Sequence, residues 1–146
     1  MVTDVDVFMP HIIAFKPRLE SQGIKMMVSN PCFEVWLYYS RRTDKFEGFV
    51  TPANPDALSS AVKTFVHTQT GGVNPMKALY DIETGITNAR ATYSEDANAI
   101  PTLFSTNMYV LAERIKPLLQ GGLAVLRKQD EERIAYYKAL SKKGDC

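Results

Sequence analysis

Hydrophobic residues recur along the amino end of the chain with two different spacings, which predict a strand, a helix and a second strand. Residues 1–8 alternate between apolar and polar side chains, as in a short strand that leads into a loop. Pro10 suits the first turn of a helix, and the apolar residues of its predicted inner face are Ile12, Ile13, Phe15 and Leu19. Pro17 is expected to kink or shorten this helix, Gly23 to end it, and residues 24–28 to form the second strand. The order strand, helix, strand predicts a compact parallel β-α-β unit.

The segment Ser29-Asn30-Pro31 is predicted to end the second strand and to start a helix. Asn30 is suited to the N-cap and Pro31 to the first helical position. The helix that follows is expected to direct Phe33, Trp36 and Leu37 towards the core.

The rest of the chain is predicted to be helical. Asn54 and Pro55 repeat the cap-plus-proline pattern and open a helix whose inner face consists of Leu58, Ala61, Val62 and Phe65. Gly71 and Gly72 mark a loop, and Gly121 and Gly122 a hinge. Further helices are expected over residues 76–93, 105–119 and 125–140, the first with Leu79, Ile82, Ile86 and Ala89 on one face.

The predicted fold class is α/β, with a short parallel β-α-β core followed by a largely helical C-terminal half. Two strands do not make a stable sheet, so either further strands precede residue 1 or helices and a partner chain cover the exposed edge. Residues 1–120 are predicted to form one domain and residues 121–146 a charged C-terminal helix. The alternating charge signs of that helix are typical of a solvated or partner-facing surface.

Composition narrows the class of protein. A chain of 146 residues with 45% hydrophobic and 23% charged residues suits one globular domain. The net charge of +1 means that binding to nucleic acid would need a local basic patch. Cys32 and Cys146 match no disulfide framework or zinc motif, and Cys32 is expected to be a small buried hydrophobe. Without a signal peptide or a membrane-spanning stretch in the sequence, the predicted location is the cytoplasm.

Asp4 and Asp6 form the first group of residues that could carry chemistry. They lie two apart at the end of the first predicted strand, so in an extended chain both carboxylates face the same space. Ligands of open α/β sheets bind at the carboxyl edge, and paired carboxylates suit Mg²⁺ or Mn²⁺. The alternative is a pair of solvated aspartates in a turn.

Glu34 is the second candidate, because it follows the neighbouring predicted strand and therefore starts from the same edge. In the first turn of a helix it either complements the helix dipole or acts as a functional carboxylate. If the β-α-β unit is correct, Glu34 and the two aspartates share one rim and could share one metal.

Two further groups of residues could contact nucleic acid. Tyr38 and Tyr39 could stack on bases, and the alternative is core packing. A basic margin for phosphates could be formed by Lys16, Arg18, Arg41, Arg42 and Lys45, and the alternative is a solvated helix surface.

These motifs resemble the RloB family of Toprim-like, phage-defence-associated proteins. Residues 29–39, SNPCFEVWLYY, resemble the Ser-Asn-Pro-x-Phe-Glu-x-Trp signature of that family, and residues 2–8 resemble its aspartate-x-aspartate strand. Weaker similarities follow at Leu79-Tyr80, at Ile86 with Asn88-Ala89-Arg90, and at residues 105–111, so the resemblance covers about residues 2–119.

The resemblance implies a divalent-metal-dependent nuclease of bacterial defence (abortive infection) that cuts DNA or RNA, often beside an ATPase partner. It implies Asp4, Asp6 and Glu34 as catalytic and metal-binding candidates, with Mg²⁺ or Mn²⁺ as cofactor. Toprim domains also carry an earlier glutamate, whereas only Met1, Val2 and Thr3 precede Asp4. The expectation is therefore a fragment, a misassigned start or a degenerate subunit that is inactive alone. The alternative is a non-catalytic interaction subunit of an ATPase-containing complex, and self-association is a further candidate.

Overall fold

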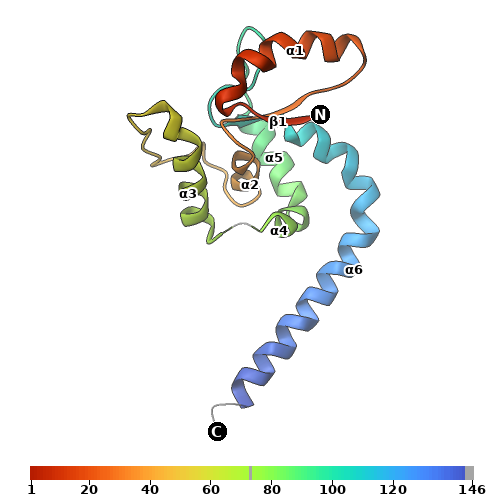
Figure 1. Ribbon diagram of the computed structural model, residues 1–146. Coiled ribbons are helices and arrows are strands. Elements are labelled where there is room, and N and C mark those ends of the chain that lie inside the picture. Colours follow the sequence, from red (N-terminus) through yellow and green to blue (C-terminus); the bar gives the residue numbers. More distant parts are fainter. Residues whose placement is uncertain (73, 144–146) are drawn as a thin grey trace. The chain divides into compact units, whose positions relative to one another are not determined.

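The computed structural model describes residues 1–72 and 74–143, and within them it contains one three-stranded mixed sheet (Figure 1). Strand β1 (Val2–Asp4) runs parallel to β2 (Met27–Asn30), and β3 (Ser105–Thr106) runs antiparallel to β2. The central strand is therefore β2, which places Asp4 of β1 and Thr106 of β3 on either side of Ser29. The α/β class is confirmed, and the third strand is one that the sequence patterns did not predict.

The predicted β-α-β unit is present. A short 3-10 helix, η1 (Asp6–Phe8), leads into α1 (Met9–Ser21), which connects β1 to β2. Pro17 lies inside α1 and does not end it. A buried cluster joins this unit to the rest of the domain through Val5, Ile12, Met26, Val28 and Ile100. The second strand begins at Met27, three residues later than predicted, and includes Ser29 and Asn30.

Helix α2 (Glu34–Tyr39) is the centre of the helical part. All residues from Val35 to Tyr39 are buried, so the helix is covered on every side and not only on the predicted face. It packs against α3 (Leu58–Thr70) and α5 (Ile82–Thr92), which stand on either side of it in Figure 1.

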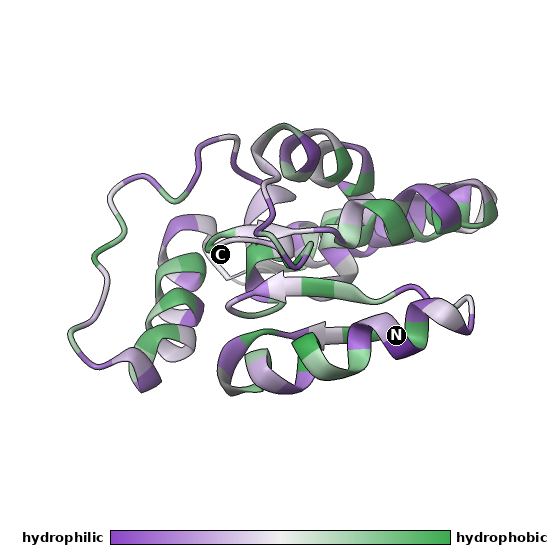
Figure 2. Cartoon of the chain, turned by 90° about the horizontal axis from the view of Figure 1, so that it is seen from above, coloured by the Kyte–Doolittle hydropathy of each residue, from purple (hydrophilic) through white to green (hydrophobic). Residues whose placement is uncertain are grey.

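The helices that follow α2 in the chain begin and end partly at local sequence signals. The side chain of Asn54 accepts a hydrogen bond from the Asp56 N–H and caps η2 (Pro55–Ala57), as the cap-plus-proline pattern predicts. Residues 76–93 were predicted to be one helix, but they form α4 (Pro75–Tyr80) and α5. The break falls at Asp81, whose backbone is not helical and whose carboxylate pairs with Arg41 at 3.0 Å. In Figure 2 hydrophobic and hydrophilic residues alternate along the helices, which is the pattern of helices with one apolar face.

Aromatic rings fill the space between α2, α3 and the loop that follows α2. Phe46 stacks on Tyr38 with ring centroids 4.1 Å apart and on Phe104 at 4.5 Å. Phe65 of α3 lies 5.8 Å from Phe46, and the Tyr39 hydroxyl donates to the Phe104 carbonyl at 2.7 Å. Tyr38 and Tyr39 are fully buried, so packing is their role and stacking on bases is excluded in this fold.

The two helices predicted over residues 105–119 and 125–140 are one helix, α6 (Met108–Lys143). The predicted start was wrong because Ser105 and Thr106 pair with β2, and the Thr106 hydroxyl accepts from the Met108 N–H. Gly121 and Gly122 do not interrupt the helix. The chain divides inside α6 into one unit of residues 1–113 and a second unit that begins at Arg114. Cys146 and the last part of the predicted segment 121–146 lie outside the described residues.

No helix in the described ranges is both long and apolar enough to span a membrane.

Candidate functional site

The carboxyl ends of β1 and β2 bring the predicted acidic residues to one edge of the sheet. Asp4 is the last residue of β1 and lies beside Ser29 of β2. Glu34 is the first residue of α2, which follows β2 after a short connection. Because the two strands are parallel, their carboxyl ends meet at the same edge, where ligands of open α/β sheets usually bind.

Asp4 is the electrostatic centre of this edge. Burial raises the pKa of its carboxyl above the usual 3.8, and the negative charges of Glu34 and, more weakly, Asp6 raise it further. The positive charge of Lys63 and a hydrogen bond from the backbone of Phe33 act in the opposite direction. The three acidic residues predicted from the sequence are therefore close enough to influence one titrating group.

Asp6 does not reach this edge in the way that the sequence suggested. The prediction assumed an extended chain through Asp4 and Asp6, but β1 ends at Asp4 and Asp6 begins η1 with a φ of 29°. The turn is held by two backbone bonds, from the Val5 N–H to the Ser29 carbonyl and from the Asp6 N–H to the Pro31 carbonyl. The spacing argument for the aspartate pair is thus wrong in its geometry, and Asp6 is an exposed residue of a turn.

Cys32 lies next to Glu34 and is buried. Burial raises the pKa of its thiol well above the usual value, and the charge of Glu34 together with a hydrogen bond to its side chain adds to this effect. Both effects disfavour the thiolate, which is the nucleophilic form of cysteine. Cys32 fits the predicted small buried residue and also provides a neighbour for the Glu34 carboxylate.

The Ser-Asn-Pro segment has a structural role that differs from the prediction. Asn30 is not the N-cap of a helix, because it is the last residue of β2 and α2 starts four positions later. Its side-chain amide donates to the Pro101 carbonyl at 2.7 Å, and its carbonyl accepts from the Phe104 N–H. Ser29 shares a 2.8 Å hydrogen bond with the hydroxyl of Thr106. This segment ties β2 to residues 101–106, a connection that the local sequence does not reveal.

Lys63 is the residue at this edge that the sequence analysis missed. It lies on α3, far from the motifs in the sequence, and carries no local signal. Most of the predicted basic margin has other partners: Lys16 pairs with Glu20, Arg41 with Asp81, and Arg42 with Asp44. Lys63 is therefore the cation whose charge the structure relates to Asp4.

A three-ligand metal site is not formed by the described residues. No three side chains from His, Cys, Asp and Glu come together among them in an arrangement that could hold a metal ion. Mg²⁺ is often held by only one or two carboxylates, with water and substrate phosphates completing its shell. Asp4 and Glu34 could supply those one or two carboxylates. The described residues do not provide a complete set of protein ligands.

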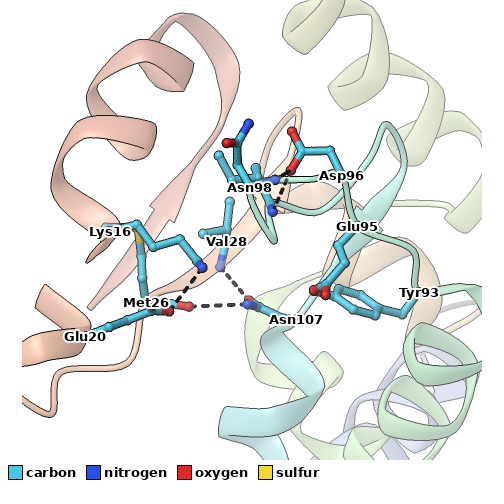
Figure 3. A network of polar contacts seen from close by, with 10 residues as sticks. Lys16, Glu20, Met26, Val28, Tyr93, Glu95, Asp96, Asn98 and Asn107 are labelled. Carbon is cyan, nitrogen blue, oxygen red and sulfur yellow. Dashed lines mark hydrogen bonds and ion pairs between the residues drawn. The ribbon is translucent and has the colours of Figure 1, made fainter. Parts of the chain in front are cut away.

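A hollow lies towards the other end of the strands, where Figure 3 shows its polar contacts. Its volume is about 520 Å³, and its wall includes Lys16, Glu20, Tyr93, Glu95 and Asn107. Lys16 pairs with Glu20 at 3.1 Å, and the Tyr93 hydroxyl donates to Glu95 at 2.5 Å. The Asn107 side chain accepts from the Val28 N–H and donates to the Met26 carbonyl. These five side chains are thus engaged in contacts within the protein.

Comparison with protein-family models, with curated proteins and with solved structures finds no match to this chain.

Proposed function

We propose that the edge formed by Asp4 and Glu34, with Asp6 farther away, binds a divalent cation, Mg²⁺ or Mn²⁺, and that the domain is a Toprim-like nuclease or the remnant of one. The observation that carries this proposal is the position of the Asp4 and Glu34 carboxylates at the carboxyl end of two parallel strands, with Lys63 near them. The resemblance of residues 29–39 to RloB-like proteins adds the biological setting, which is defence against phage in the cytoplasm, with DNA or RNA as substrate.

Each residue has a defined part in this proposal. A bound cation would neutralise phosphate charge and activate water. Asp4, held by the Phe33 backbone, and Glu34, beside the Cys32 thiol, would bind the cation, with Asp6 more distant. Lys63 would attract the phosphate of the substrate and would also favour the ionised form of Asp4.

Titration calorimetry of the full chain with MnCl₂ and MgCl₂ tests the site. We expect binding in the millimolar range or tighter, and at least about a tenfold loss of affinity in Asp4→Asn and in Glu34→Gln. Glu47→Gln is the matched control, because Glu47 is exposed and does not shift the Asp4 pKa. The assignment is wrong if wild type gives no binding heat, or if Asp4→Asn and Glu34→Gln bind as wild type does.

The alternative is a non-catalytic interaction subunit of an ATPase-containing defence complex. It is favoured by one observation, that Tyr136 and Tyr137 of the long C-terminal helix are exposed. Cleavage assays with single-stranded DNA, duplex DNA and transfer RNA in MnCl₂ separate the two proposals. Metal-dependent cleavage that is lost in Asp4→Asn supports the nuclease, whereas a stable ATPase complex without cleavage supports the interaction subunit.

A further inference from the structure

The second unit of the chain is a stretch of helix α6 that leaves large apolar residues exposed. Within it Leu126 is 40% exposed, Leu140 47% and Tyr137 63%. A helix on its own is only marginally stable in water, and helices in proteins gain most of their stability by packing an apolar face against other parts of the structure. A helix that exposes such residues therefore calls for an explanation of what covers them.

The residues along one side of this helix recur with a strict alternating spacing. Steps of four and three residues connect Leu119, Leu123, Leu126, Asp130, Arg133, Tyr137 and Leu140. This is the heptad repeat of a coiled coil, with Leu123, Asp130 and Tyr137 at its a positions and the other four at its d positions. Five of the seven positions are apolar, and the two charged ones are neighbours in the middle.

The two charged positions determine the direction in which a second, identical helix can pair. Arg133 and Asp130 form an ion pair within the chain at 2.7 Å. In a parallel, in-register pair each a position faces the same a position, so Asp130 would face Asp130 and Arg133 would face Arg133. In an antiparallel pair a positions face d positions, so each Asp130 faces the partner's Arg133. Like charges at an interface are costly, and opposite charges select the register.

We propose that residues 123–140 of two copies of this chain form an antiparallel coiled coil centred between Glu131 and Glu132. In this register Leu126 packs on the partner's Tyr137, and Leu123 packs on the partner's Leu140. Asp130 and Arg133 form the two central layers, where each side chain has an oppositely charged neighbour in both chains. The tyrosine hydroxyl can reach water at the margin of the layer, as amphipathic side chains do. The second copy is the partner that matches, because the charge pattern is complementary to itself.

Sedimentation equilibrium of the full chain, from about 1 µM to about 100 µM, tests the pairing. Wild type should dimerise in this range. Asp130→Arg and Arg133→Asp should each raise the dissociation constant about 100-fold, since each creates two like-charge layers. The double variant D130R/R133D should restore the dimer, because the swap recreates opposite charges across an antiparallel pair. Glu131→Arg, which makes the same change of charge at an exposed position outside the stripe, should dimerise as wild type does.

Disulfide trapping tests the direction independently, in a Cys146→Ser background in which the remaining Cys32 is buried. The double variant L126C/Y137C should form a covalent dimer on oxidation, whereas L126C alone should remain monomeric on denaturing gels. Circular dichroism checks that each variant is folded. The proposal is overturned if wild type is monomeric at the highest concentration, if the double swap does not restore the dimer, or if L126C alone is trapped. The last result would show a parallel pair. These readouts do not depend on a metal or on cleavage, so they leave the proposed nuclease site untested.

Discussion

The indole ring of Trp36 lies directly against Gly85, and no side chain fits between the two helices that carry them. A Cβ atom placed on Gly85 would stand 2.9 Å from Cη2 and 3.2 Å from Cζ2 of Trp36. Both residues are buried, and they lie where α2 packs against α5. The sequence predicted that Trp36 faces the core, but no local pattern singles out Gly85.

Gly85→Ala should destabilise the protein by about 1–3 kcal/mol, because the added methyl group overpacks a rigid ring in a close-packed interface. Gly121→Ala is the matched control, since a Cβ at this helical position meets nothing within 4 Å. It should stabilise the protein by about 0.5–1 kcal/mol through helix propensity. Urea unfolding of both variants measures the difference. If both substitutions stabilise, the contact with Trp36 is looser than described.

Trp36→Ala should cost about 3–5 kcal/mol, because it removes a large side chain that is only 6% exposed. Glu34→Ala should cost less than about 1 kcal/mol, since it loses a favourable interaction with the helix dipole but also relieves the repulsion of Asp4. Thermal melts compare the two. A larger loss in Glu34→Ala would mean that Glu34 mainly supports the start of α2 and is not a residue of the proposed metal site.

The contribution of Asp4 to the stability of the fold should decrease as pH rises. Burial and the charge of Glu34 raise the folded-state pKa of Asp4 above 3.8, so the folded state keeps the proton at a higher pH than the unfolded state. Stability therefore falls as pH rises through that pKa, and Asp4→Asn should raise the Tm at pH 7. The gain should shrink as pH falls and vanish below 3.8, where the carboxyl is protonated in both states.

Asp96→Asn should change the Tm in the opposite direction to Asp4→Asn, so it serves as the comparison. Hydrogen bonds from the backbone of Ile100 and Asn98 lower the Asp96 pKa below 3.8, so its ionised form stabilises the fold above that pH. Asp96→Asn should lower the Tm at pH 7, and the difference should vanish as pH falls through the lowered pKa. Calorimetric scans across this range check both variants, and changes of the same sign would contradict the assigned environments.

Cys32 should be almost inert towards thiol reagents in the folded protein. It is 1% exposed, and burial together with Glu34 raises the pKa of its thiol. In a Cys146→Ser background at pH 8, we expect iodoacetamide to modify Cys32 at least about 100-fold more slowly than a free thiol. Mass spectrometry follows the reaction, with protein in urea as the reactive control. Rapid modification without denaturant would show that this edge of the domain opens.

Asn107→Ala should destabilise the domain by about 1–3 kcal/mol, because it leaves the N–H of the fully buried Val28 without its side-chain acceptor. The amide of Asn107 also donates to the Met26 carbonyl, so one side chain completes the edge of β2 beyond the end of β3. Asn107→Asp should also destabilise, since a carboxylate accepts from Val28 but cannot donate to Met26. Chemical unfolding compares both with Gln69→Ala, which changes an exposed amide on α3. Equal stability of all three would exclude this role for Asn107.

The sequence by itself determined those elements whose signals are local. Alternating and helical spacings fix β1, α1 and β2, because side-chain burial follows the backbone period within each element. The cap at Asn54 was predictable because the acceptor and the N–H it binds are two residues apart. The convergence of Asp4 and Glu34 followed from the same logic, since parallel strands end at one edge.

Only the tertiary structure decided the features that join distant parts of the chain. Ser105 and Thr106 carry a strand signal too short to recognise, and they become β3 because Ser29 and Asn30 offer them a paired edge. The same pairing makes Asn30 a strand residue instead of a helix cap, because its carbonyl and amide find partners at Phe104 and Pro101. The packing of α3 brings Lys63 close enough for its charge to act on Asp4, which no local pattern encodes. In the pairing of β2 with β3 and in the bonds of Asn30, two segments that are far apart in sequence satisfy one another's polar groups. Local propensity cannot decide between that solution and its alternatives.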